Sequence, residues 1–189
     1  MAEEIPSLEV LSPVARFLVR RRTLFSWLLP LLLVAVADPW QYLMPLGAAL
    51  VALGVGLRIW AAGYLVKGKR LASSGPFAHV RNPLYLGSLV ILLGYCTLSG
   101  RWLSYPLFLM LFAAFYLPTI RWEEDSLRAK FGDDYEDYAR RVPRLFPRLT
   151  PAYASRESFS WGQVRRNREL SSLALGAIMI VLFGIRLVV

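Results

Sequence analysis

The chain has 189 residues, of which 56% are hydrophobic and 13% aromatic, and its net charge at pH 7 is +9. This composition, with a positive mean hydropathy, is typical of a membrane protein. We therefore interpret the excess of Lys and Arg as topology signals and contacts to anionic lipid head groups, and expect no nucleic acid as a partner. A single cysteine, Cys96, excludes an intramolecular disulfide, and with one histidine, His79, too few soft ligands remain for a zinc or iron site.

Apolar stretches predict membrane-spanning helices at residues 17–37, 43–66, 83–99, 102–120 and 170–189. The fold class that we predict is all-α, a polytopic membrane bundle of about five transmembrane helices with short cytoplasmic interfacial helices. No small-residue cleavage site follows the first apolar stretch, so we do not expect a cleavable signal peptide.

We interpret the 189 residues as one integral membrane domain with three parts. Residues 1–66 supply N-terminal helices, residues 67–148 a catalytic core, and residues 149–189 an interfacial helix and the last span.

The second predicted span combines small residues with one charge. Gly47, Gly54 and Gly56 suit close packing against another helix. Arg58 lies inside the same stretch, and an intramembrane arginine usually faces a cavity or a partner. The alternative is that its side chain snorkels toward the Lys67 end of the helix.

The distribution of basic residues predicts the orientation. Lys and Arg concentrate in residues 1–23, 67–82 and 121–169. The turns at residues 38–42 and 99–101 hold only Arg101. Since cytoplasmic loops carry the excess of Lys and Arg, we place the N-terminus and all the basic regions in the cytoplasm and the C-terminus outside.

The region after the fourth span predicts two helices and an extended segment. A helix continues to Phe131, Gly132 is a plausible stop, and Asp133 with Glu136 forms an N-cap and capping-box pattern for a helix to Arg141. Residues 142–147 are expected to be extended because prolines flank them.

Residues 158–169 have the pattern of an interfacial basic helix. We expect Phe159 and Trp161 to face lipid. The basic side chains Arg165, Arg166 and Arg168 are expected to face head groups.

The stretch Gly75–Gly87 is unusually polar and rich in turn residues for a membrane protein. Pro83 suits the first turn of the third span, and Asn82 is a candidate cap. Arg81 could make a bidentate contact to a carboxylate or phosphate. On residue types alone, the favoured interpretation of this stretch is a capped helix start with Arg81 and His79 at lipid head groups.

A second polar block begins with Glu123 and Glu124. Adjacent carboxylates at a membrane border are unfavourable unless they are solvated or paired, and at most one of them is expected to face the bundle. A solvated helix with an ion pair between Glu124 and Arg128 is the alternative, and it suits Glu124 better than Glu123.

Taken together, the two blocks have the pattern Gly-Pro-Phe…Arg-Asn-Pro-x-Tyr-x-Gly, an apolar hairpin, then Glu-Glu…Phe-Gly-x-x-Tyr-x-x-Tyr…Val-Pro-Arg…Pro. Over about residues 66–148, this pattern resembles the isoprenylcysteine carboxyl methyltransferase and phospholipid methyltransferase superfamily of integral membrane enzymes. The resemblance implies an S-adenosylmethionine pocket between the end of the second span, the start of the third, and the helix after the fourth.

The resemblance also implies which residues form this pocket. Those expected at the cofactor are Leu71, Ala72, Phe77, His79, Arg81, Asn82, Pro83, Leu84, Tyr85, Gly87 and Glu123. Arg121, Glu123 and Tyr85 are the expected catalytic residues, with Arg121 the nearest match to a family arginine that acts on the substrate. Asn82 stands where family members commonly have histidine, so a role that needs imidazole there is not expected.

The chemistry of the cofactor agrees with these residue types. Glu123 suits its ammonium group, Arg81 or helix N–H groups suit its carboxylate, and Phe77 or Tyr85 suits the adenine or the sulfonium face. Methyl transfer is an in-line displacement, which needs positioning more than a reactive side chain.

The sequence favours a carboxylate as the methyl acceptor and leaves others open. A carboxylate needs only an orienting arginine, such as Arg121 or Arg144, whereas the amine of a phospholipid needs a base, for which His79, Glu123 and Glu124 are candidates. In either case we expect a lipophilic substrate that enters from the bilayer.

Two further classes remain as alternatives to a methyltransferase. NADPH-dependent membrane reductases of the sterol type resemble the same helical arrangement and carry an Arg-x-Pro-x-Tyr-like element. A non-catalytic membrane protein that only binds lipid is the other. The Phe-Gly-x-x-Tyr-x-x-Tyr and Val-Pro-Arg elements favour the methyltransferase.

Overall fold

The computed structural model of the chain describes residues 16–17, 28–66, 70–154 and 157–188. Within them the regular structure is helical, and the elements in chain order are α2 (Met44–Tyr64), the 3-10 turn η2 (Gly75–Ala78), α3 (Pro83–Ser99), α4 (Ser104–Phe131), α5 (Asp133–Arg141), α6 (Trp161–Arg166) and α7 (Leu170–Val188). The predicted all-α class is confirmed, and the described helices form a membrane-type bundle.

The described helices agree with four of the predicted spans. Among them α2, α4 and α7 are long and apolar enough to cross a membrane, and α3 is a shorter apolar helix. The first predicted span, 17–37, lies partly outside the described residues, which are helical over 28–35. The basic residues Arg20 to Arg22 also lie outside the described residues.

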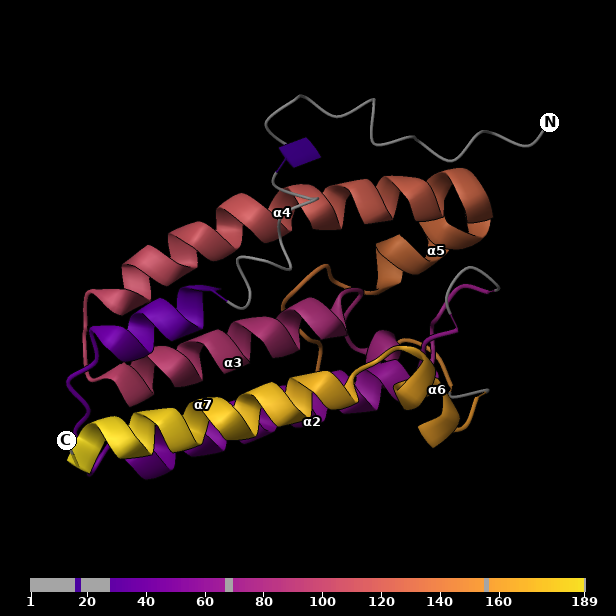
Figure 1. Cartoon of the computed structure of the whole chain (residues 1–189). Coiled ribbons are helices and arrows are strands. Elements are labelled where there is room, and N and C mark those ends of the chain that lie inside the picture. The colour runs from indigo at the N-terminus through magenta and orange to yellow at the C-terminus, as the bar shows by residue number, and fades with distance from the viewer. Residues whose placement is uncertain (1–15, 18–27, 67–69, 155–156, 189) are drawn as a thin grey trace.

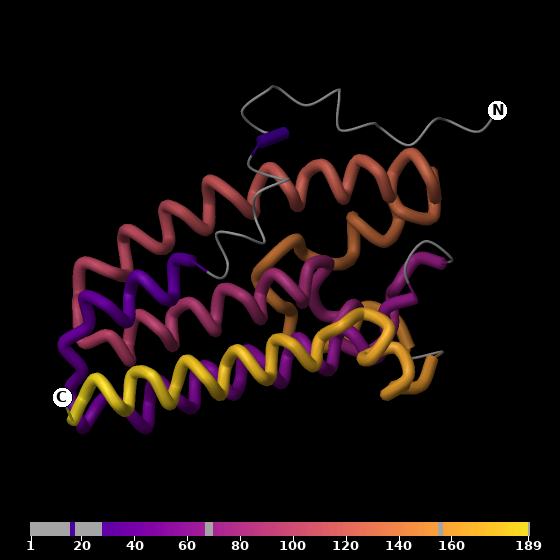
Figure 2. The backbone as a smooth tube through the Cα atoms, in the orientation of Figure 1, coloured from indigo at the N-terminus to yellow at the C-terminus, as the bar shows by residue number. Residues whose placement is uncertain are grey.

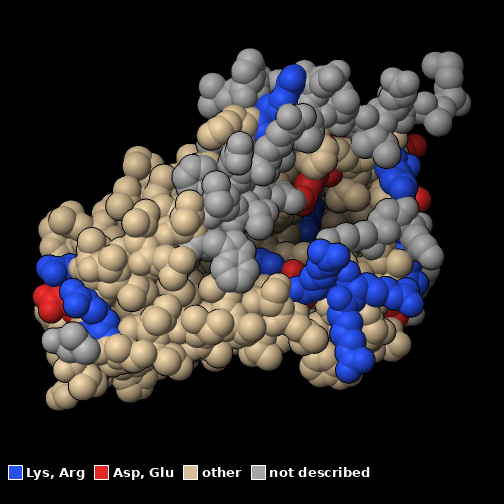
Figure 3. All heavy atoms as spheres, viewed as in Figure 1, with Lys and Arg blue, Asp and Glu red and all other residues tan. Residues whose placement is uncertain are grey.

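The helices are arranged around α3. It contacts α2 and α7 as well as α4, and Figure 1 shows α4 on the opposite side of α3 from the α2–α7 pair. The connections that carry the polar blocks gather at one end of the bundle, together with α5 and α6 (Figure 1). In Figure 3 charged residues collect toward the ends of the molecule and a band without them lies between. Both polar blocks thus share one end, as the counting of spans predicts.

Glycines bring α2 and α3 into backbone contact. A Cβ atom on Gly54 would lie 2.6 Å from the Gly87 carbonyl oxygen, and one on Gly94 would lie 2.9 Å from the Gly47 carbonyl oxygen. Because no side chain fits between the helices at these positions, the predicted small-residue packing of the second span is confirmed. Gly56 is the exception, with open space around its Cα.

The helix after the fourth span continues to Phe131 without a break, as predicted. Gly132, at a φ of 51°, ends α4 and allows α5 to begin at the next residue. The predicted capping box is wrong by one position, because Asp133 is already helical and no side chain caps α5.

Beyond α5 the chain turns back toward the start of α3 (Figure 2). The Arg81 amide donates to the Pro143 carbonyl at 2.8 Å, and the Ala152 amide donates to the Ala78 carbonyl at 2.9 Å. The Tyr138 hydroxyl donates to the Phe77 carbonyl at 2.9 Å. Residues 142–147 are non-helical, but they bend at residues 142 and 144–146 instead of being extended throughout as predicted. The segment fastens η2 and the start of α3 to α5.

The interfacial helix is shorter than predicted, since α6 covers only Trp161–Arg166. Trp161 is exposed as expected, but Phe159 packs against Gly63 and the Tyr64 ring instead of facing lipid. The cause is the glycine, which leaves a gap on α2 that the Phe159 ring fills. Arg165, Arg166 and Arg168 are exposed.

The connection from α6 to α7 closes the end of α2. The Asn167 amide donates to the carbonyls of Ala62 and Leu65 at 3.0 and 2.9 Å, which satisfies two carbonyls at the C-terminal end of α2. Arg168 follows with a φ of 59°. This left-handed residue breaks the helix between α6 and α7, and Glu169 is buried directly after it.

Candidate functional site

A cavity of about 800 Å³ lies between the C-terminal end of α2, the start of α3, α4 and α7. At the polar end of the bundle its walls include Leu71 and Ala72, which lie in the loop after α2. Deeper in the bundle its walls include Tyr95, Phe108 and Phe112. The cavity thus has a polar mouth and an apolar, aromatic interior.

Most of the residues that the sequence predicts at the cofactor line this cavity. They are Leu71, Ala72, Phe77, Arg81, Asn82, Pro83, Leu84, Tyr85 and Glu123. The two polar blocks, separated in sequence by the α3–α4 hairpin, are therefore brought to one cavity.

His79, Gly87 and Arg121 do not line the cavity. The His79 ring contacts the Arg148 carbonyl through Nδ1 at 2.9 Å. Gly87 faces α2, where a Cβ atom would lie 2.6 Å from Arg58 Cγ. Arg121 is exposed on α4. The geometry therefore gives these residues packing or surface positions.

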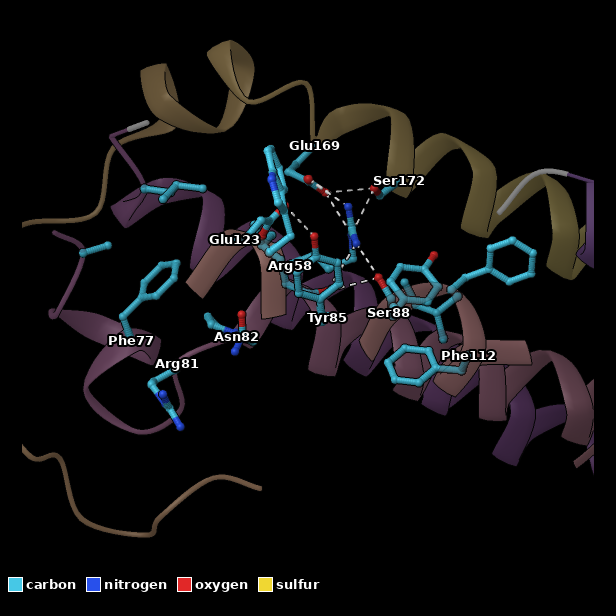
Figure 4. Close-up of a pocket in the computed structure, with 18 of the residues that line it drawn as sticks. Arg58, Phe77, Arg81, Asn82, Tyr85, Ser88, Phe112, Glu123, Glu169 and Ser172 are labelled. Atoms are coloured by element: carbon cyan, nitrogen blue, oxygen red, sulfur yellow. Dashed lines mark hydrogen bonds and ion pairs between the residues drawn. The ribbon is translucent and has the colours of Figure 1, made fainter. Parts of the chain in front are cut away.

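Tyr85 and Glu123 join the start of α3 to α4. The Tyr85 hydroxyl donates to Glu123 Oε1 at 2.7 Å, and the Tyr85 ring packs edge-on against Tyr116 with centroids 5.5 Å apart. This places one carboxylate and one aromatic face at the same wall of the cavity (Figure 4).

Glu124, not Glu123, is the deeply buried carboxylate, with 3% of its surface exposed. It accepts hydrogen bonds from the Asn82 amide at 3.0 Å and from Arg144 Nε at 2.9 Å, and Arg81 Nη1 lies 3.4 Å away. The interpretation of Glu124 as solvated and paired with Arg128 is therefore wrong.

The helix register explains this correction. The buried positions of α4 include Phe108, Phe112, Phe115 and Thr119, at spacings of four, three and four residues. Glu124 continues this buried face four residues after the buried Ile120, and Glu123 lies beside it toward the cavity. Asn82 likewise uses its side-chain amide for Glu124 and makes no cap hydrogen bond to α3.

Arg81 lies between the buried network and the cavity. Its Nε is buried and has no hydrogen-bond partner among the described residues, and the same is true of the Tyr135 hydroxyl. Burial raises the pKa of Tyr135, and the negative charge of Glu124 raises it further. The network therefore holds Arg81 and Arg144 around the one buried carboxylate of Glu124.

Arg58 lies at the cavity wall and is paired across the bundle with Glu169. Its Nε and Nη2 donate to the two carboxylate oxygens of Glu169 at 3.0 and 2.8 Å. Nη1 donates to the Ser88 hydroxyl at 2.5 Å and to the Leu84 carbonyl at 3.2 Å, and the Ser172 hydroxyl also donates to Glu169. Of the two readings of Arg58, the structure supports the one in which it faces a cavity and a partner (Figure 4).

Glu169 and Ser172 were not among the residues predicted from the sequence. One signal could have identified Glu169: it is the last charged residue before an apolar stretch, and Arg58 is an opposite charge inside another stretch. For Ser88 the signal is weaker, namely its position one helical turn after Tyr85.

Comparison with known proteins relates part of this sequence to a known family. Residues 42–134 match the phospholipid methyltransferase family. The chain is 29% identical over 191 aligned residues to the nickel-cobalt-cadmium resistance protein NccN of Alcaligenes xylosoxydans xylosoxydans, covering 93% of this chain and 88% of that protein.

Two relatives are named as methyltransferases. The protein-S-isoprenylcysteine O-methyltransferase of Schizosaccharomyces pombe is 35% identical over 57% of this chain and 44% of its own length. Methanethiol S-methyltransferase 2 of Bradyrhizobium diazoefficiens is 41% identical over 37% of this chain and 26% of its own length. The chain thus spans less than half the length of either methyltransferase.

No solved structure matches the chain. The described residues contain no group of three or more His, Cys, Asp or Glu side chains that could hold a metal ion. The resemblance to the isoprenylcysteine carboxyl methyltransferase and phospholipid methyltransferase superfamily is confirmed by the family match and these relatives.

Proposed function

We propose that this chain, whose core carries the sequence pattern of the isoprenylcysteine carboxyl and phospholipid methyltransferases, is an S-adenosylmethionine-dependent membrane methyltransferase with a lipophilic acceptor. One observation carries the proposal: the motif residues of both polar blocks line one cavity that continues into the apolar bundle. S-adenosylmethionine would supply a methyl group on a positively charged sulfonium.

The residues at the polar mouth fit this donor. A cavity of about 800 Å³ is within the range of roughly 300–1,000 Å³ for small-molecule sites. Glu123, oriented by the Tyr85 hydroxyl, would bind the ammonium group, and Arg81, which lines the cavity, would bind the carboxylate. Phe77 and Tyr85 offer aromatic surfaces to the adenine and the sulfonium.

The interior of the cavity suits an acceptor with a long apolar chain. Its walls there include Leu92 and Tyr95 from α3, Phe108 and Phe112 from α4, and Leu175 from α7. Burial of apolar surface stabilises such a ligand by about 25 cal/mol per Å². The apolar chain of an acceptor from the bilayer would then occupy the interior, and its polar end would lie near the donor at the mouth.

Carboxylate O-methylation remains the favoured reaction. The route to an amine acceptor that used His79 as a base has no support, because His79 lies outside the cavity. Arg121 also lies outside it, so a different cation must orient a carboxylate acceptor. We place the mouth on the cytoplasmic side, where the basic connections are concentrated and the donor is soluble.

Incubation of the purified protein with radiolabelled S-adenosylmethionine and a total lipid extract tests the proposal directly. We expect a labelled lipid-soluble product. Glu123→Gln should lower its yield at least tenfold, whereas Glu136→Gln should not, because Glu136, on α5, does not line the cavity. Calorimetry should detect S-adenosylmethionine binding and no NADPH binding. Binding of NADPH alone would indicate a reductase and refute the proposal.

A further inference from the structure

We propose that Arg58, held in place by Glu169, recognises the polar end of the methyl acceptor and selects an anionic group over a cationic one. This inference rests on the proposed function and adds to it a specificity-determining residue and its positioning partner. Both residues line the cavity, and Glu169 lies outside residues 42–134, which match the family.

The guanidinium of Arg58, on α2, is fixed from two sides. It is held by Glu169 and Ser172 from the α7 side and by Ser88 and the Leu84 carbonyl from α3. Four of its N–H groups have partners among the described residues, and a guanidinium has five donors. One N–H on Nη2 is therefore available to a ligand without breaking the pair.

Arg58 is the more accessible member of the pair. Its side chain is 21% exposed and that of Glu169 is 10% exposed. Both carboxylate oxygens of Glu169 accept hydrogen bonds from Arg58 or Ser172. A ligand in the cavity therefore meets a cation, and the carboxylate behind it keeps the pair neutral as a whole.

Arg58 belongs to α2, but its contact with Ser88 shows how deep it lies along the neighbouring helix α3. This depth fits the acceptor rather than the donor. Ser88, which binds Arg58, lies three residues after Tyr85, which binds Glu123. Three residues of α-helix rise by about 4.5 Å, so Arg58 sits roughly one helical turn deeper than the carboxylate assigned to the donor. Figure 4 shows Arg58, Tyr85 and Ser88 close together, with Arg81 projecting away from them.

Charge decides between the acceptor classes. In a low-dielectric cavity the guanidinium end of this neutral pair attracts a carboxylate and disfavours an ammonium, although less strongly than an unpaired guanidinium would. A neutral thiol or amine gains little from it. The carboxylate also suits the reaction: one of its oxygens forms a bond to the methyl carbon as the methyl–sulfur bond breaks, and the electron pair of that bond stays on sulfur. A neutral ester and a neutral thioether result, and no proton needs to be moved.

Three acceptors with the same sixteen-carbon chain test the selection: hexadecanoic acid, hexadecylamine and hexadecanethiol, each in nanodiscs with the protein and radiolabelled S-adenosylmethionine. We expect the acid to be methylated at least tenfold faster than the other two. Binding of radiolabelled hexadecanoic acid without the donor, measured by scintillation proximity, gives a second readout that does not depend on turnover.

The double variant Arg58→Gln/Glu169→Gln separates recognition from folding. It removes both charges together and keeps hydrogen-bonding side chains of similar size, so no unpaired buried charge remains. The matched control is Arg101→Gln/Asp38→Asn, which neutralises an exposed ion pair at the other end of the bundle. We expect the double variant to bind S-adenosylmethionine within about twofold of wild type, and hexadecanoic acid at least tenfold more weakly.

The outcomes distinguish this inference from the proposed function. The role of Arg58 would be refuted by unchanged acid binding in the Arg58→Gln/Glu169→Gln variant, or by faster methylation of the amine or thiol than of the acid. Neither result would contradict the proposed methyltransferase function. Absence of label on the acid in the wild-type protein would overturn the role of Arg58 equally. Failure of the wild-type protein to bind S-adenosylmethionine would instead refute the proposed function.

Discussion

Replacing Glu124 with glutamine should destabilise the polar end of the bundle more than any exposed charge change. The carboxylate is 3% exposed and is the common acceptor for Asn82, Arg81 and Arg144. Glutamine keeps one acceptor oxygen but removes the charge, and its amide adds a donor that faces the guanidinium groups of Arg81 and Arg144.

The size of the effect follows from the burial of each partner. Arg144 is 45% exposed, so solvent screens its contribution, which we take as small. Arg81 is 14% exposed, and the loss of its counter-ion resembles the breaking of a buried pair, which costs about 3–5 kcal/mol. Allowing for the contact of 3.4 Å, we expect a loss of about 3 kcal/mol. For a chain of this size, that lowers the melting temperature by roughly 6–12 °C.

Cys96 provides the assay. It is the single cysteine of the chain and is 1% exposed in the interior of the bundle, so a thiol-reactive fluorescent maleimide reports unfolding in detergent. The matched control is Glu136→Gln, because Glu136 pairs with Arg128 and both side chains are more than 40% exposed. The control should shift the melting temperature by less than about 4 °C.

A shift for Glu124→Gln no larger than that for Glu136→Gln would refute the reasoning. It would mean that the buried carboxylate does not hold the loop segments together, despite its short contacts to Asn82 and Arg144.

Three further predictions concern the cavity wall, the helix seam and the α5 anchor. Tyr85→Phe removes the hydrogen bond to Glu123 and should weaken S-adenosylmethionine binding about tenfold in calorimetry without lowering the melting temperature. Gly87→Ala should lower the free energy of unfolding by about 1–3 kcal/mol, because its Cβ would lie 2.8 Å from a carbonyl oxygen of α2. The control Gly56→Ala has open space around the new Cβ, so the melting temperature in the maleimide assay should stay unchanged or rise. Burial raises the pKa of Tyr138 above its ordinary value of 10.0, so stability should be intact below about pH 10 and fall as the pH rises further; Tyr138→Phe should flatten that fall in melts recorded across the alkaline range.

Local patterns were sufficient to predict the helical framework. Pro83 begins α3 because its missing N–H costs nothing in a first turn. Gly132 separates α4 from α5 because glycine adopts a positive φ readily. The close seam between α2 and α3 also follows from residue size alone, since Gly54 and Gly87 leave no room for side chains.

The choice between Glu123 and Glu124 needed a longer view of the sequence. Judged within one turn, both are acids at a membrane border. The prediction that at most one of them faces the bundle is wrong, because Glu123 lines the cavity and Glu124 is buried. The stripe of buried positions that begins at Phe108 assigns Glu124 to the interior. Its cations, by contrast, come from loops, and no periodicity predicts that Arg144 reaches it.

The partner of Arg58 could not be derived from local pattern, because Glu169 is 111 residues away. The sequence does identify Arg58 as a charge that needs compensation. What it does not provide is the left-handed backbone at Arg168, which interrupts α6 and α7 directly before Glu169, or the Asn167 amide that anchors this turn on α2.

The separation between Arg58 and Glu169 has a consequence for biogenesis. In a chain made from its N-terminus, the helix that carries Arg58 reaches the bilayer long before its counter-charge exists. At about 5–20 residues per second, the chain from Arg58 to Glu169, a separation of 111 residues, takes roughly 6–22 s to synthesise. During that interval the insertion machinery, water or lipid head groups must accommodate the guanidinium. Arrival of α7 then both neutralises the charge and completes the cavity, so truncation before Glu169 should leave a nascent chain that quality-control proteases recognise.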